Sequence, residues 1–228
     1  MSAVALVRAR RFSQRISLDS MAMMLQYDNA FKGIKQRSSE MTEHVPTYDE
    51  ALSILKEFVK SDNLLKHSYS VEGVMRHMAH KMGEDEDKWA IIGLVHDLDY
   101  EMFPEHHCEK AREILCEKGW PEEYVRAVAS HGWGICNDIE PQTNLEKVLY
   151  AIEELTGLIT AVAIIRPSRS VKDLEAKSVM KKWKDKSFAA GVNRSLIEKG
   201  TEMLGLELGD LVDDVILGMR EVADRIGL

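Results

Sequence analysis

The sequence predicts an all-α fold, a single helical bundle with additional C-terminal helices, on three observations. Apolar residues recur three or four positions apart over most of the chain after residue 47, which is the period of one helix face. Helix start and stop signals bracket these segments. No segment alternates convincingly as a strand does, and no internal repeat is present. With 228 residues, 45% of them apolar, the chain can bury one good-sized core or two modest ones.

The first two helices have clear boundaries. Thr47 and Glu50 form a capping box, in which the hydroxyl and the carboxylate each bind a backbone amide at the helix start. The ten residues that follow, 51–60, place their apolar side chains on one broad face. A second helix is expected over residues 62–82, ended by Gly83 in the left-handed conformation.

Three further helices precede a loop. Residues 89–98 are apolar almost all round, which predicts a helix buried on every side. The fourth helix is expected over 104–118, and Gly119 ends it. The fifth runs from Pro121 to His131, and a loop follows over 132–142.

The C-terminal part continues as helices. Thr143 caps a long sixth helix that ends at Arg166, before Pro167. Two or three more helices are expected, of which the first is capped by Ser170 and the last covers 211–226. We therefore divide the chain into three parts: a basic leader over 1–40, a helical domain over 41–165, and a helical extension over 166–228 packed on that same domain.

The leader differs from the body in charge. The whole chain carries a formal charge of −8, but residues 1–40 hold seven basic and three acidic side chains, a net +4. Its Arg-rich start is typical of a mitochondrial transit peptide, and the alternatives are a disordered tail or an upstream start, with Met41 as the original one. Three cysteines without CxxC spacing indicate a reducing compartment without a disulfide framework. We expect a cytoplasmic protein, with the mitochondrial matrix as the alternative.

Charge and hydropathy exclude two classes of partner. The acidic balance argues against bulk nucleic-acid binding. No apolar run approaches the roughly 18 residues that a membrane span needs, so no membrane association is expected. The sequence gives no oligomeric state.

Histidines gather in the middle of the chain, seven of the eight lying between His67 and His131. On helical wheels His67, His107 and His131 fall on inward faces, and His96 ends the buried helix beside Asp97. One inward histidine is more often a hydrogen-bonded core residue than a ligand. Four of them with a buried carboxylate favour metal coordination, because burying so many ionisable groups uncompensated is costly. The histidines expected to face water are His77, His80 and His106.

This order of residues resembles the HD-domain superfamily of metal-dependent phosphohydrolases, most closely its HDIG-type hydrolases. The resemblance covers about residues 48–157. It implies that His67, His96 and Asp97 bind a first metal, that Asp97 bridges to a second, and that the final acidic ligand falls at Glu153. The remaining ligands implied by the resemblance, for the second metal, are His107 and His131.

The sequence departs from the family pattern in three places. The final ligand is Glu153 instead of Asp, and its alternative interpretation is an exposed acid on the helix surface; Glu154 points further from the core. Asp99 and Tyr100 stand where the family has Gly and Lys. The stretch after His131 has neither a His-His pair nor a GYP motif, which argues against the cyclic-dinucleotide branch.

The resemblance implies an enzyme that hydrolyses a phosphoester of a small metabolite or nucleotide with metal-activated water. The metals are expected to be two divalent ions; Fe, Mn, Co, Ni and Zn are not distinguishable, and Mg is possible. The candidate catalytic residues are Asp97 and Asp99, although an exposed turn acid is the alternative for the latter. Residues 166–194 carry a net +6, and Lys186 and Arg194 within them are candidate substrate-binding residues. Two alternatives stay open: a di-iron oxygenase on the same scaffold, and a regulatory metal-binding domain without turnover.

Overall fold

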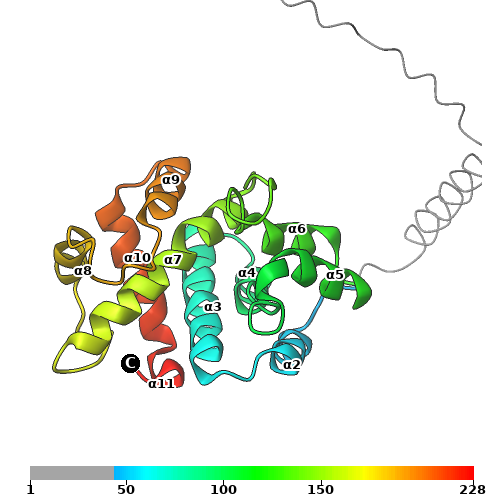
Figure 1. The fold of residues 1–228 in the computed structure, drawn as a ribbon, viewed down its shortest axis with the longest axis horizontal. Coiled ribbons are helices and arrows are strands. Elements are labelled where there is room, and N and C mark those ends of the chain that lie inside the picture. Colours follow the sequence, from blue (N-terminus) through cyan, green and yellow to red (C-terminus); the bar gives the residue numbers. More distant parts are fainter. Residues whose placement is uncertain (1–43) are drawn as a thin grey trace, which may run out of the picture. The chain divides into compact units, whose positions relative to one another are not determined.

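The structure, a computed structural model, describes residues 44–228, so the leader and Met41 lie outside the described residues. Over this range the chain forms ten α-helices and a short 3-10 turn, η1 (Pro104–His106), without strands (Figure 1). The all-α prediction is confirmed. The helices are α2 (Tyr48–Phe58), α3 (Asp62–Met82), α4 (Glu86–Val95), α5 (Glu109–Glu117), α6 (Glu122–Ser130), α7 (Asn144–Ile165), α8 (Ala176–Trp183), α9 (Arg194–Leu204), α10 (Leu208–Glu221) and α11 (Ala223–Ile226).

The helix boundaries read from caps agree with the structure. The Thr47 hydroxyl accepts from the Glu50 amide, and Glu50 Oε2 accepts from the Thr47 amide at 2.7 Å. Gly83 ends α3 at φ 70°, and a second capping box starts α7 at Thr143. These signals depend only on neighbours three or four residues apart, which is why the sequence reveals them.

The core lies around α3 and α4. α3 packs along α4 on one side and along α10 and α7 on others, as Figure 1 shows at the centre of the bundle. Residues 89–95 of α4 are all buried, which confirms a helix covered on every side. Gly218 allows α10 to approach α3 closely, since a Cβ there would lie 2.6 Å from Val74 Cα. The C-terminal helices therefore complete the core that holds α3 in place.

One described helix, α7, is long and apolar enough by length and composition to cross a membrane. The expectation that no such segment exists was therefore wrong. In the structure 61% of that apolar window is buried against the rest of the chain. α7 packs against α3 and α9 and carries Glu153, so its length and apolar character are accounted for by its central place in the core.

Three local predictions need correction. The expected helix over 104–118 is interrupted, because Cys108 adopts φ 67° and α5 begins only at Glu109; His107 therefore lies on a turn instead of a helix face. Ser170 caps no helix, and α8 begins at Ala176. His77 is mostly covered, with its Nδ1 3.1 Å from Glu221 Oε1 on α10, a helix that the wheel of α3 cannot show.

Candidate metal centre

The Asp97 carboxylate lies among four histidine rings. Its Oδ2 is 3.4 Å from His96 Nε2 and 3.7 Å from His67 Nε2. Its Oδ1 is 3.2 Å from His131 Nε2 and 3.5 Å from His107 Nε2. The two oxygens of one carboxylate thus each face two imidazole nitrogens, all of them Nε2 atoms.

Two of the rings are fixed by the backbone of the helices that they end. His96 Nδ1 lies 2.8 Å from the Gly93 carbonyl, and His131 Nδ1 lies 2.5 Å from the Val128 carbonyl. A carbonyl can only accept, so each Nδ1 carries the hydrogen and each neutral ring keeps a lone pair on Nε2. That tautomer is the one in which Nε2 binds a metal.

The third ring is fixed by Asp99. His107 Nδ1 is 2.8 Å from Asp99 Oδ1, and Asp99 Oδ2 accepts from the Ala111 amide at 2.8 Å. Asp99 is fully buried, so the interpretation of it as an exposed turn acid was wrong. The structure places this candidate catalytic residue behind His107, where it orients the ring and satisfies the start of α5.

The fourth ring, His67, is held more loosely. The Thr156 hydroxyl donates to the Glu153 carbonyl at 2.7 Å, which leaves its oxygen free to accept from His67 Nδ1 at 3.5 Å. Glu153 Oε1 faces the other side of the ring, 3.4 Å from His67 Nε2. Glu153 is half-buried and points toward the histidines, so its alternative as an exposed surface acid does not hold.

These atoms form two groups with the spacing of metal ligands. His67, His96, Asp97 and Glu153 each offer one atom, and the four atoms lie within 4.8 Å of one another. His107, Cys108 and His131 form a second such group. Within residues 44–228, His96 Nε2 is buried and has no hydrogen-bond partner, which is costly unless a cation takes its lone pair. The donor set of imidazole nitrogens and carboxylate oxygens suits a divalent metal ion.

The Asp97 carboxylate and the neighbouring histidines stabilise each other's charged forms. Burial opposes the ionisation of Asp97, but the neighbouring His96 and a hydrogen bond from His131 hold its pKa well below its usual range. Burial also opposes the protonation of His131, and Asp97 outweighs it and raises the pKa of His131 to about 9. The protein thus stabilises positive charge at this centre, and a metal has to displace those protons when it binds.

Comparison with known proteins agrees with this geometry. Residues 64–174 match the family model described as the HD domain. This segment belongs to the HD domain superfamily. The HD domain therefore contains the whole centre just described, from His67 to Glu153, and the resemblance noted in the sequence is confirmed.

The relatives found in the comparison are distant. The chain is 28% identical to a ribonuclease Y of Acholeplasma laidlawii over 171 residues, 72% of this chain and 30% of that protein. A ribonuclease Y of Oleidesulfovibrio alaskensis is also 28% identical, over 73% of this chain and 31% of that protein. A tRNA (cytidine(56)-2′-O)-methyltransferase of Picrophilus torridus is 25% identical over 83% of this chain and 56% of that protein. The chain thus spans between about a third and about half of these relatives, and no solved structure matches it.

A cavity of about 370 Å³ opens beside the candidate metal ligands of the HD domain. Glu154 lines it, although the sequence placed this side chain away from the core. Burial and the neighbouring Glu153 raise the pKa of Glu154 to about 6. A wheel of α7 could not reveal this position, because the opposite wall comes from segments far away in the chain. The other lining residues are Asp97, Tyr100, His107, His131, Gly132, Ile135, Cys136, Glu153 and Gly191.

Two thiols border the second half of the HD-domain centre. The Sγ atoms of Cys108 and Cys136 are 2.9 Å apart, and Cys108 Sγ is 3.9 Å from His131 Nε2. Hydrogen bonding with Cys108 lowers the pKa of Cys136 to about 6, and burial opposes it. The sequence carried no signal for this pair, because the two residues are 28 positions apart and share no motif.

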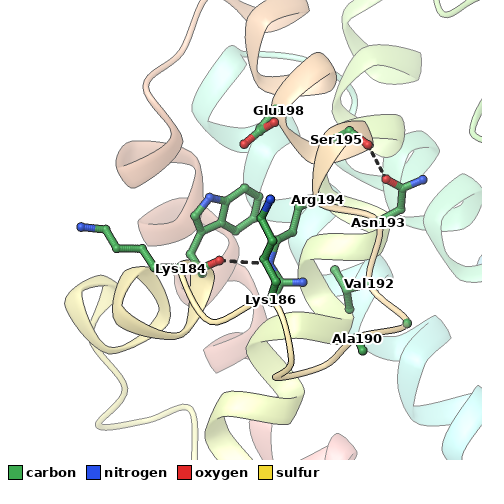
Figure 2. Close-up of a pocket in the computed structure, with 10 residues that line it drawn as sticks. Lys184, Lys186, Ala190, Val192, Asn193, Arg194, Ser195 and Glu198 are labelled. Carbon is green, nitrogen blue, oxygen red and sulfur yellow. Dashed lines mark hydrogen bonds between the residues drawn. The ribbon is translucent and has the colours of Figure 1, made fainter.

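The candidate substrate-binding residues lie in a separate groove of about 770 Å³ (Figure 2). Arg194 is largely committed to the chain itself, donating to the carbonyls of Trp183 at 3.1 Å and Phe188 at 2.8 Å. Lys186 is exposed at the rim of this groove. Gly191 lines both the groove and the metal cavity, so the two hollows adjoin. The structure does not bring Lys186 and Arg194 into the cavity that Asp97 lines.

Proposed function

We propose that this HD domain is a metal-dependent hydrolase that cleaves a phosphoester of a small metabolite or nucleotide with metal-activated water. The observation that carries the proposal is the pair of Asp97 oxygens, each of which faces two histidine Nε2 atoms. Three of the four rings have Nδ1 tied within 2.8 Å of an acceptor, so Nε2 is the nitrogen that each of these rings leaves for an ion.

Each half of the centre has its own ligands. His67, His96 and Glu153 would hold one ion with Asp97 Oδ2, and His107 and His131 would hold the other with Asp97 Oδ1. The second position would have fewer protein ligands, and an ion held there would be more open to water and to a phosphoryl oxygen. Two bound divalent ions supply an activated water and neutralise the charge that develops on the phosphoryl group.

The protein's own part is to hold the candidate ligands in position. Asp97 keeps the two ligand sets in register, and Asp99 holds the His107 ring in place from behind. The cavity would give a small substrate access to Asp97, and Lys186 at the adjoining groove would add positive charge for an anionic substrate.

Size and charge favour a small substrate. The cavity of about 370 Å³ falls in the range typical of small-molecule sites, roughly 300–1,000 Å³. The net charge of −8 weighs against bulk nucleic-acid binding. Two relatives are named as ribonucleases, which cleave phosphodiesters, and this agrees with phosphoester hydrolysis as the reaction class. We keep the cytoplasm as the proposed location.

The test is a hydrolysis screen on protein loaded with Mn, Fe or Mg, using nucleotides, sugar phosphates and a short RNA. We expect release of phosphate from at least one small ester, abolished by chelation and by Asp97→Ala. Oxygen consumption by iron-loaded protein, without phosphate release, would instead identify a di-iron oxygenase. Full metal loading with neither activity would indicate a regulatory domain, and either result would overturn the proposal.

A further inference from the structure

The free thiols of Cys108 and Cys136 lie close enough together to form a disulfide. The two Sγ atoms are 2.9 Å apart, and a disulfide requires about 2.05 Å, so closing the bond takes less than about 1 Å of movement. Cys108 is 1% exposed and sits at the turn before α5. Cys136 is exposed and lines the metal cavity, so a small solute in that cavity can reach its sulfur.

The backbone around the pair leaves the sulfurs in direct contact. A Cβ at Gly132 would lie 2.3 Å from Cys136 Sγ and 2.5 Å from Cys108 Sγ, so only glycine lets both thiols pack there. The loop that carries Cys136 is closed on itself, with the Cys136 amide donating to the Gly132 carbonyl at 3.0 Å. Asn137 Nδ2 ties the same loop to the Ala129 carbonyl at 2.8 Å. The two sulfurs are therefore held together by the fold, and nothing separates them.

We propose that Cys108 and Cys136 form a reversible disulfide when hydrogen peroxide enters the cavity that Cys136 lines. The Cys136 sulfur attacks one peroxide oxygen, the O–O bond breaks, and a sulfenic acid and water form. The Cys108 sulfur then attacks the Cys136 sulfur, the S–O bond breaks, and a second water leaves with the Cys108 proton. Two thiols lose two electrons in total, and the peroxide is reduced to two waters. A transient bond of this kind is compatible with a reducing compartment.

The disulfide has a direct route to the metal centre. Cys108 follows His107 in the chain, and its sulfur lies 3.9 Å from His131 Nε2, so both histidines of the second position border the pair. Closing the bond moves the turn that carries His107 and removes a thiol from the cavity wall. We expect oxidised protein to retain less metal at the second position. This consequence rests on the proposed function, whereas formation of the disulfide does not.

The experiment uses the full chain freed of metal with a chelator, so that its outcome is independent of the proposed function. After treatment with one equivalent of hydrogen peroxide, remaining thiols are alkylated and the protein is digested and mapped by mass. We expect a loss of two hydrogens per chain, one linked peptide pair that contains Cys108 and Cys136, an alkylated Cys116, and full reversal by dithiothreitol. Peptides in which both cysteines remain alkylated, or are oxidised without a link, would overturn the proposal.

Matched variants separate the pair from general oxidation. Cys116→Ser removes the third cysteine, which lies on the far part of α5 and is exposed, and should form the same link. Cys136→Ser should form none, and as an exposed position it is expected to fold. A link between Cys116 and either other cysteine in the wild type would count against the proposal.

Metal content of reduced and oxidised protein after loading with Zn then tests the expected loss of about one ion per chain, and equal contents would overturn the link to the metal centre.

Discussion

The two sides of the Asp97 carboxylate are built from different kinds of backbone. On the Oδ2 side, His67 and Glu153 project from the long helices α3 and α7, and His96 follows the buried residues 89–95 of α4. On the Oδ1 side, His107 lies on a turn and His131 ends the short α6, beside a loop that contains Cys136. Besides Asp97 itself, the helical side offers three candidate ligands, and the turn side offers two histidines together with two oxidisable thiols.

Because of this difference, we expect the two positions to bind metal with different strength. Ligands on packed helices are held in place by the core, so the first position should bind its ion tightly and keep it. Ligands on turns depend on local hydrogen bonds such as the one between Asp99 and His107, so the second position should exchange its ion more readily. Both thiols also lie on the Oδ1 side, beside the cavity that Cys136 and Asp97 line.

The two sides should differ most in the metal content that remains after one histidine ring is removed from either side. His96→Ala removes a buried ligand from the helical side, and we expect metal content to fall by at least one ion per chain with loss of hydrolysis. His107→Ala should lose only the more weakly bound ion. Elemental analysis at limiting metal measures both, with the exposed His106→Ala as control. Equal retention of the tight ion in His96→Ala and His107→Ala would remove the distinction.

The helical side also depends on how α7 is packed. Gly200 of α9 lies against α7, and a Cβ there would be 2.5 Å from Ala151 Cα. We expect Gly200→Ala to lower the free energy of unfolding by about 1–3 kcal/mol, because backbone must move to admit the methyl group. Gly209→Ala in α10, where nothing lies within 4 Å of the added Cβ, is the control and should not destabilise. Denaturant unfolding measures both, and similar values for the two variants would contradict the close packing of α9 on α7.

A smaller effect is expected from the residue that orients His107. Asp99→Asn replaces a charged acceptor by a neutral one 2.8 Å from His107 Nδ1 and keeps its size. We expect metal affinity at the second position to weaken by about 10–100-fold, with the first position unchanged. Competition with a calibrated chelator measures the two affinities separately. Equal weakening of both positions would show that Asp99 supports the centre as a whole.

The smallest effect should come from the corresponding residue on the helical side. Thr156→Val removes the hydroxyl that lies 3.5 Å from His67 Nδ1, a long contact with a neutral acceptor. We expect less than about a tenfold loss of affinity, and only at the first position, because packing on α3 still holds the ring. The same chelator competition applies. A loss as large as that of Asp99→Asn would contradict the claim that the core holds the first position.

The sequence sufficed for features that depend on near neighbours. The boxes at Thr47 and Thr143 and the stop at Gly83 are local, and the inward face of His67 follows from helical periodicity alone. The order of histidines around Asp97 led to the correct superfamily.

Features that depend on tertiary contacts could not be predicted from the sequence. The turn at His107 follows from the positive φ of Cys108, for which the sequence has no glycine to mark it. The buried Asp99 carboxylate accepts hydrogen bonds from the Ala111 amide and the His107 ring. Neither partner is identifiable from sequence spacing. Glu154 lines the cavity together with Gly191, which comes from the segment before α9, and spacing along α7 cannot show that neighbour.

The most direct test of the account is the number of metal ions bound by the full chain, counted by native mass spectrometry after loading with Zn and removal of excess. We predict two ions per chain in the wild type, one in His107→Ala, and none in Asp97→Ala, because both positions share the Asp97 carboxylate. Two ions retained by Asp97→Ala, or none bound by the wild type, would contradict a centre bridged by this residue.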